Sequence, residues 1–334
     1  MGLALVLWTG AQSTRGPEDP PGLQLAQEPG VVTGLIGSLG VALDGPVAFF
    51  AEVDAFAQAR TARCEEAARS DPRYLPLCQD ELLRQAYLTY RDGDAWSVAV
   101  GRKRLLQGGF AQKSGDEEKV LPNPYLDFQL PLPDSQAAFE ATFGDAVALQ
   151  VTDDVTTEAS SRGVFEDAHH QPALLAEVRH RSGTFSSLLQ AQLYDLNKSH
   201  AATLGVAWRH PALAGSLDLT RDDRAQKIVE EFGAATPSTI LTQATLVVEG
   251  LPDGVVRPFV KVARLEVRQA PGGRRVNTFG FDDDGQSWTI GSWYGVPGDA
   301  WKAMFSYGET TGRFASGTLR WRRFMTTLVV AEVP

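Results

Sequence analysis

The feature that most constrains the fold is an alternation of side-chain polarity with a period of two residues, repeated from Val31 to the end of the chain. The repeating segments are about 9–14 residues long, and turn-forming residues divide them. In residues 301–307, for example, Trp, Ala, Phe and Tyr alternate with Lys, Met and Ser. Successive side chains of a strand point to opposite faces of a sheet. The pattern therefore predicts an all-β chain.

The connections between these segments alternate in length. Short turns that tolerate a positive φ occur at Asp44-Gly45, Asp92-Gly93, Gly144-Asp145, Ser182-Gly183, Asp253-Gly254 and Asp284-Gly285. Longer connections fall between them, at roughly Thr61–Glu81, Leu106–Ser135, Asp154–Gln171 and Asp222–Pro237. This alternation of short and long connections predicts antiparallel strands with tight turns at one end and long loops at the other.

The N-terminal residues fit two alternatives. Gly2–Trp8 is a short apolar stretch followed by small residues, as in the remnant of a signal peptide, but it also has the composition of a first strand. Ser13–Pro29 is rich in Pro, Gly, Glu and Gln and is expected to be a flexible lead segment. Residues 1–30 are therefore set apart from residues 31–334, which carry the repeated pattern.

The composition excludes several classes of protein. The net charge of −10 argues against a nucleic-acid partner, which requires clustered positive charge. No run of about 18 apolar residues occurs, so no helix is expected to span a bilayer. Two cysteines and five histidines do not supply the ligand spacing of a metal site, because the adjacent pair His169-His170 lacks a third spaced ligand, and no cofactor motif occurs. We therefore expect no metal, no cofactor and no enzymatic activity.

The two faces of the segments indicate a membrane environment. The polar face carries few charges and consists mainly of Ser, Thr, Gln and Gly. A soluble β-sandwich instead exposes a face with many charged residues to water. Aromatic residues recur near the ends of the apolar face: Tyr90, Trp96, Trp208, Trp288, Trp301, Tyr307 and Trp321. Aromatic girdles at the two membrane interfaces give this distribution. Lipid also forbids open sheet edges, so the strands must close into a ring.

Residues 84–103, RQAYLTYRDGDAWSVAVGRK, are similar to the hairpin unit of substrate-selective porins, and the loop rhythm extends the resemblance over most of Val31–Val333. The chain thus resembles Gram-negative outer-membrane porins. The resemblance implies a single closed antiparallel transmembrane β-barrel of about 16 strands (16–18), located in the cell outer membrane. It also implies contact with outer-membrane lipid and a homotrimer. One departure is the C-terminus, which lacks the final aromatic residue of many porins.

A barrel of about 16 strands leaves an aqueous channel, so passive diffusion of small polar solutes is the expected function. The alternation assigns eleven charged residues to the pore lining: Glu52, Asp54, Glu140, Glu177, Arg179, Asp218, Arg257, Lys261, Lys302, Arg320 and Arg322. The basic cluster in the last third of the chain is expected to favour anionic solutes. The alternative is that these charges are paired and give no selectivity.

The segment Leu106–Ser135 is the best candidate for a loop that folds inward and constricts the pore. It begins with Gly108-Gly109, which permits a sharp change of direction, and it contains an apolar-aromatic stretch with Tyr125, Asp127 and Phe128. The alternatives are an external loop and an additional strand.

Cys64 and Cys78 lie within one long loop and would form a local disulfide in an oxidising compartment. The alternative is a pair of free thiols.

Two other functional classes remain open. The alternating, Trp-rich strands also fit a soluble carbohydrate-active enzyme or binding protein, with Glu52 and Asp54 as paired carboxylates. A barrel that serves as a structural subunit of an outer-membrane complex is the third possibility.

Overall fold

The computed structural model describes residues 2–15, 30–43, 45–55, 83–106, 108–113, 135–156, 169–194, 199–222, 239–269, 285–295, 301–314 and 317–332. The strands are β1 (Gly2–Arg15), β2 (Gly30–Ala42), β3 (Val47–Asp54), β4 (Leu83–Asp92), β5 (Trp96–Arg104), β6 (Ser135–Phe143), β7 (Val147–Thr156), β8 (His169–Ser182), β9 (Phe185–Tyr194), β10 (Ser199–His210), β11 (Leu213–Asp222), β12 (Thr239–Gly250), β13 (Val256–Gln269), β14 (Gly285–Tyr294), β15 (Trp301–Phe314) and β16 (Gly317–Glu332). One short helix, α3 (Phe110–Lys113), follows β5. No helix within these ranges is long and apolar enough to cross a membrane.

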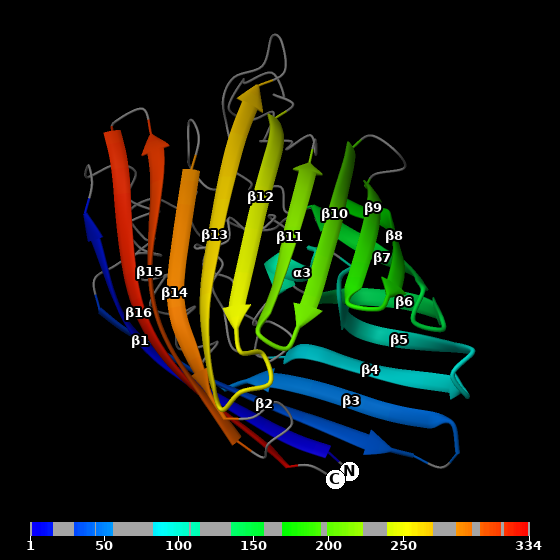
Figure 1. Ribbon diagram of the computed structural model, residues 1–334. Helices are drawn as coiled ribbons and strands as arrows, with labels where there is room; N and C mark the ends of the chain where they lie inside the picture. Colours follow the sequence, from blue (N-terminus) through cyan, green and yellow to red (C-terminus); the bar gives the residue numbers. More distant parts are fainter. Residues whose placement is uncertain are drawn as a thin grey trace.

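The strands form one antiparallel meander in which each strand pairs with its neighbours in the chain (Figure 1). β1 pairs with β2 on one side and with β16 on the other, from Leu3↔Glu332 to Arg15↔Arg320, so the sheet is a closed barrel. The all-β antiparallel fold predicted from the alternation is confirmed. Residues Gly2–Arg15 form β1, which makes the number of described strands even.

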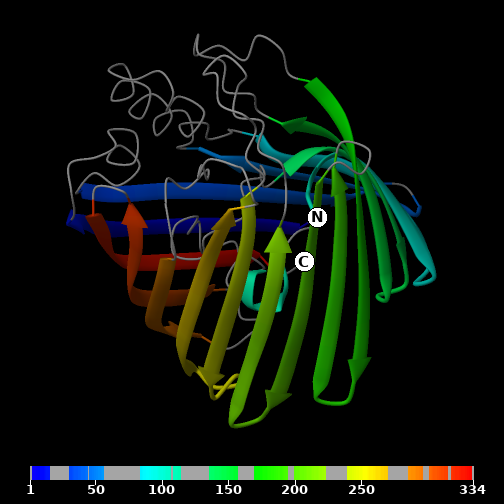
Figure 2. The same ribbon diagram turned by 90° about the horizontal axis from the view of Figure 1, so that it is seen from above.

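The even number of strands brings both ends of the chain to the same end of the barrel, where they lie side by side (Figures 1 and 2). The tight turns predicted at Gly93, Gly144 and Gly183 lie at this end, each with a positive φ. We call this the short-turn end. The opposite end carries the long connections, and most of their residues lie outside the described ranges.

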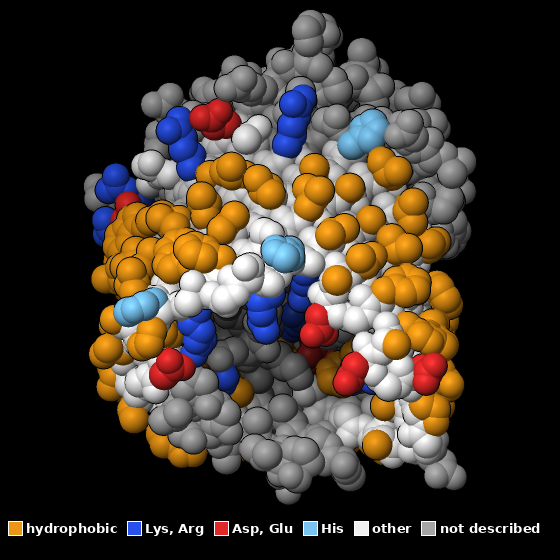
Figure 3. Space-filling view, turned by 45° about the vertical axis from the view of Figure 1, so that its right-hand side comes forward, with side chains coloured by type: hydrophobic (Ala, Val, Ile, Leu, Met, Phe, Trp, Pro, Cys, Tyr) orange, Lys and Arg blue, Asp and Glu red, His pale blue; other side chains and the backbone are white. Residues whose placement is uncertain are grey.

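The two faces of the sheet have the reverse of the polarity found in a soluble protein. Side chains that point into the barrel are buried and mostly polar, and Gln150, Gln190 and Thr245 have no exposed surface. The alternate side chains point outward and are large, apolar and exposed, as are Val100 (53%) and Leu189 (55%). In Figure 3 hydrophobic side chains cover much of the outer surface. A chain that exposes its apolar face and buries its polar face is adapted to lipid outside and water inside.

At Gly101 the sheet leaves no room for a side chain. Its φ is +133°, and a Cβ atom would lie 2.4 Å from the carbonyl oxygen of Ala86 on β4. We expect Gly101→Ala to destabilise the barrel by about 1–3 kcal/mol, because the strain and the clash both involve backbone atoms. The measurement is the denaturant midpoint of the folded barrel in lipid vesicles. Gly37→Ala is the control, because the nearest atom to a Cβ there is 4.0 Å away. Equal midpoints for the two variants would contradict the prediction.

Candidate functional site: the inward face of the barrel

The chain that follows β5 turns into the barrel. Leu106 is buried there, and its backbone N–H donates to Oε1 of Gln150 on β7 at 3.0 Å. Nε2 of Gln192 on β9 donates to the carbonyl oxygen of Leu106 at 2.7 Å. Both glutamines belong to the buried face of the sheet. The segment therefore passes along the inner wall, which it reaches through side-chain amides rather than through strand pairing.

The helix α3 ends this described segment and lies against the inner wall of β10, β11 and β12. The backbone N–H of Gln112 donates to Oδ2 of Asp218 at 2.7 Å, and Nε2 of Gln112 donates to Oγ1 of Thr220 at 3.0 Å. Gly205 on β10 gives room for this contact, because a Cβ there would lie 2.8 Å from Asp218 and 3.2 Å from the ring of Phe110. Asp218 and Gln112 thus tether the segment to a wall far from its origin on β5.

The expectation of an inward loop can be compared with the structure only at its beginning. Residues 108–113 lie inside the barrel, and Gly108 has a φ of +75° where the sequence suggested a sharp change of direction. Tyr125, Asp127 and Phe128 lie outside the described residues. Cys64 and Cys78 also lie outside them, so the expected disulfide stays a prediction.

Three acidic residues of the inner wall lie on β3, β6 and β8, where basic partners accompany them. Glu52 is fully buried, and its Oε1 lies 3.7 Å from Nε of Arg84 and 3.4 Å from Nη2 of Arg104. Glu140 on β6 is paired with Lys103 on β5. Two of the predicted residues, Glu177 and Arg179 on β8, pair with one another. These acids are therefore largely compensated, and Arg179 is exposed near the end of its strand.

Basic residues dominate the inner wall of β12 to β15. Arg257, Lys261 and Lys302 point inward, and Glu249 is the one inward-pointing acid among the described side chains of these four strands. Trp293 on β14 lies between two of the bases, with the guanidinium carbon of Arg257 5.6 Å and the ammonium of Lys302 5.7 Å from its ring centroid. This wall therefore carries a net positive charge.

Two predicted pore residues are on the wrong face. Arg320 and Arg322 share the strand face of Phe324, Leu328 and Val330, which are exposed on the outside of β16. Nε of Arg320 lies 3.2 Å from Oε1 of Glu309 on β15, and Nε of Arg322 lies 2.8 Å from Oε2 of the same carboxylate. The register places Glu309 opposite Arg322 on that outer face. The sequence Arg-Trp-Arg-Arg at 320–323 is basic on both faces, so charge alone did not identify the inward set. The side chain of Asp54 lies outside the described residues.

The sequence reasoning also missed residues on the inner wall. It selected charged residues and overlooked the glutamines at 85, 150, 190, 192 and 243, which are all buried on the inward face. The sequence could have identified them, because Gln190 and Gln192 lie two residues apart on the polar face of their strand, as the predicted charged residues do on theirs. Trp293 was missed because aromatic residues were assigned to the membrane girdles.

The described side chains of the inner wall are mostly polar or charged, and no reactive constellation is evident among them. Among the described residues, no three His, Cys, Asp or Glu side chains lie close enough to hold a metal ion. The face seen in Figure 3 is hollowed, and Lys, Arg, Asp and Glu side chains lie around the rim of the hollow.

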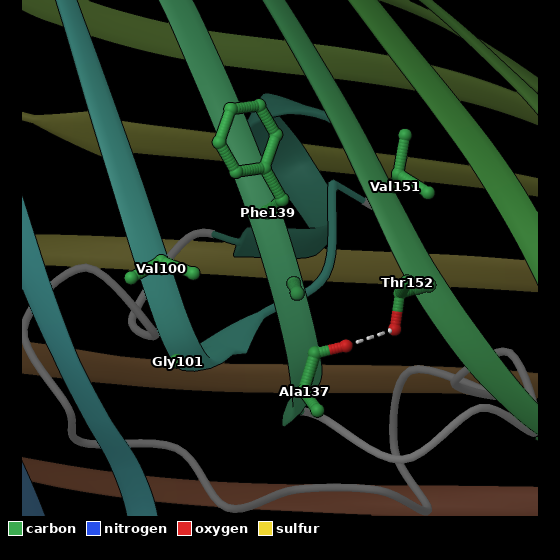
Figure 4. A pocket seen from close by; sticks show the side chains of 7 residues that line it. Val100, Gly101, Ala137, Phe139, Val151 and Thr152 are labelled. Atoms are coloured by element: carbon green, nitrogen blue, oxygen red, sulfur yellow. Dashed lines mark hydrogen bonds between the residues drawn. The ribbon is translucent and has the colours of Figure 1, made fainter.

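A separate notch lies across β5, β6 and β7, where Val100, Phe139 and Val151 frame Gly101 and Ala137 (Figure 4). The hydroxyl of Thr152 donates to the carbonyl oxygen of Ala137 at 2.8 Å. The three framing side chains are exposed on the outward, apolar face. Since no charged side chain lines it, the notch is a poor candidate for a polar solute site.

Comparison with solved structures identifies the fold as a porin-like β-barrel. OmpT, an outer-membrane protein of Vibrio cholerae, superposes with a TM-score of 0.57 at 8% identity, covering 99% of this chain and 98% of that one. Pseudomonas putida OprB gives 0.56 at 12% identity, covering 99% and 93%. An anion-selective porin from Comamonas acidovorans gives 0.55 at 11% identity, covering 99% and 98%. No family model matches the sequence, and no curated protein sequence matches it.

Proposed function

We propose that this protein is an outer-membrane channel that allows passive diffusion of small polar solutes. The observation that carries the proposal is the reversed polarity of the barrel, with buried Gln, Thr, Glu and Asp side chains inside and exposed Leu, Val and Phe side chains outside. Polar residues that face a common interior keep it hydrated, and a barrel of this strand number is wide enough for water and solute.

Placement in the outer membrane of a Gram-negative bacterium belongs to the same proposal. Outward aromatic pairs at Tyr90–Trp96 and Trp288–Tyr307 fit the interfacial girdles of a barrel in lipid. The superposed OmpT is described as an outer-membrane protein, and it has also been solved in a trimer form. A homotrimer of this chain stays a prediction.

The finer proposal is a preference for anions. It is supported by the inner wall of β12 to β15, where Arg257, Lys261 and Lys302 outnumber the one inward acid of these strands, Glu249. Asp218 of the adjacent β11 lies near Lys261, and the acids Glu52, Glu140 and Glu177 of β3, β6 and β8 have basic partners. Rings or walls of one charge select the opposite ion in a pore.

The experiment is conductance of the purified protein in planar bilayers, followed by the reversal potential in a KCl gradient. We expect discrete channel openings with a chloride-selective reversal potential. Replacing Lys261 and Lys302 by Gln should move that potential toward cation selectivity, because it removes positive charge from the wall. Arg264→Gln is the matched control, since Arg264 points outward from the same strand as Lys261. Absence of openings would contradict the channel, and an unchanged potential in the double variant would contradict the anion preference.

The soluble-enzyme and structural-subunit alternatives make different predictions in the same preparation. A soluble enzyme would be extracted without detergent, and the exposed apolar band argues against this. A structural subunit would need detergent but would not conduct. Conductance therefore separates the two membrane alternatives.

A further inference from the structure

Two arginines on the outer face of the barrel share a single carboxylate. Arg320 and Arg322 point outward from β16, and Glu309 on β15 contacts both, with its Oε1 3.2 Å from Nε of Arg320 and its Oε2 2.8 Å from Nε of Arg322. The two arginine side chains are 51% and 48% exposed, whereas that of Glu309 is 15% exposed. One carboxylate balances only one of the two cations, so this cluster presents a net positive charge on accessible guanidinium groups.

The position of the cluster along β16 places it at a border of the apolar outer surface. The outward residues that follow Arg322 include Phe324, Leu328 and Val330, which are all exposed. Val330 is eight residues beyond Arg322. That separation is about 27 Å along a strand and about 20 Å along the membrane normal at a tilt of about 40°, against an apolar band about 25 Å tall. Because β16 begins at the long-loop end, the cluster lies at the membrane interface on the long-loop side.

Aromatic side chains adjoin the cluster on the same outer face. The register places Glu309 opposite Trp288 on β14, and it places Tyr307 on β15 opposite Phe324. The rings of Trp288 and Tyr307 are in contact, with their centroids 5.6 Å apart, and both are exposed. Aromatic rings at this level of a barrel pack at the boundary between lipid headgroups and acyl chains. The surface therefore offers cations to a headgroup and rings to the carbon chains attached to it.

The neighbouring strands continue the basic border. Arg221 on β11 and Arg264 on β13 are exposed and point outward near the long-loop end, and Arg264 lies 3.3 Å from Glu266. Among the described outward side chains of β11 to β16 at this end, four arginines accompany two glutamates. Figure 3 shows Lys and Arg side chains along the upper border of the hydrophobic surface. A border with this excess of positive charge attracts an anionic partner.

We propose that Arg320, Arg322 and Trp288 form a binding site for a phosphate-bearing anionic lipid in the membrane leaflet at the long-loop end. The forks of two guanidinium groups match the oxygens of one phosphate, and Glu309 neutralises only one of the two charges. The site goes beyond the channel and rests on the proposed placement in the outer membrane, where the long loops face the outside of the cell. A free phosphate ion would leave the aromatic rings without contact, so a lipid is the better occupant.

The test is calorimetric titration of the folded barrel, purified in a non-ionic detergent, with dioctanoyl phosphatidate. Dioctanoyl phosphatidylcholine and inorganic phosphate are titrated for comparison. The phosphatidate should bind at least about tenfold more tightly than either, because only it combines acyl chains with a phosphate whose charge is not balanced within the headgroup. Equal affinity for the two lipids would overturn the recognition of charge, and equal affinity for inorganic phosphate would overturn a lipid as the occupant.

Replacing both Arg320 and Arg322 by Gln should weaken phosphatidate binding about tenfold or more and leave phosphatidylcholine binding unchanged. The charge-matched control replaces Arg181 and Arg209 by Gln, because both are exposed at the short-turn end, and it should bind phosphatidate as the unmodified protein does. Glu309→Gln keeps the site testable if the double variant folds poorly. It removes the carboxylate that competes for the two cations, so it should tighten phosphatidate binding. Unaltered binding in either the double variant or Glu309→Gln would overturn the site.

Two further measurements on the same preparations separate the possible failures. Far-ultraviolet circular dichroism checks that each variant retains its sheet. Conductance in planar bilayers distinguishes the lipid site from the channel. A barrel that prefers phosphatidate but does not conduct contradicts only the channel, and a barrel that conducts without this preference contradicts only the lipid site.

Discussion

Leu217→Arg should strongly destabilise the barrel or prevent its insertion. Leu217 lies in the middle of β11, points outward and is 40% exposed. In the proposed orientation this position meets the hydrocarbon core, where an arginine on the lipid face of a barrel costs about 2–4 kcal/mol. The measurement is the free energy of unfolding in phospholipid vesicles, together with the yield of folded barrel.

The control for this prediction is Leu213→Arg on the same strand and the same face. Leu213 is the first residue of β11, directly after the tight turn from β10, and it is 45% exposed. At that depth an arginine reaches the membrane interface, where the cost is only about 0–1 kcal/mol. A soluble β-protein would show no such dependence on position along the strand. Equal effects of the two substitutions would therefore contradict lipid as the solvent of the outer face.

The fold could be predicted from the sequence because period-two alternation and turn chemistry are local signals. Asp92-Gly93 and Gly144-Asp145 form tight turns as predicted, each between two strands. The face of a strand is harder to predict where both faces carry the same chemistry. At β16 the run from Arg320 to Arg323 is basic on both faces, so only the register against Glu309 of β15 shows which arginines point outward.

The site could be predicted only in part, because its arrangement depends on contacts between residues distant in sequence. Glu140, Arg257 and Lys261 were identified by alternation alone and do lie on the inward face. The pairing of Glu52 with Arg104, and the contact of Trp293 with Arg257, depend on which strands become neighbours and on where the chain after β5 enters the barrel. Alternation carries no information on either point.

Asp218→Ala should release the inward segment and enlarge the open channel. The Asp218 carboxylate accepts the backbone N–H of Gln112 and is fully buried, so it holds α3 against β11. A hydrogen bond to a charged group contributes about 1.5–3 kcal/mol, which corresponds to roughly a 10- to 100-fold change in the tethered population. Loss of the tether should therefore raise single-channel conductance and increase the noise of the open state. The measurement is single-channel recording in planar bilayers at high salt, where charge effects on ion flow are screened.

Asp218→Asn separates the tether from the charge. Asparagine keeps a carbonyl oxygen that can accept the N–H of Gln112 but removes the negative charge, so its conductance should stay near that of the unmodified protein. Asp253→Ala removes an acid that is exposed at the short-turn end and bound to Arg209, and it should leave the open-state noise unchanged. If Asp218→Asn and Asp218→Ala raised conductance equally, the effect would come from charge and not from the position of α3. A low, quiet conductance in Asp218→Ala would mean that the segment is held by the other contacts, chiefly those of Gln150 and Gln192 with the backbone on either side of Leu105.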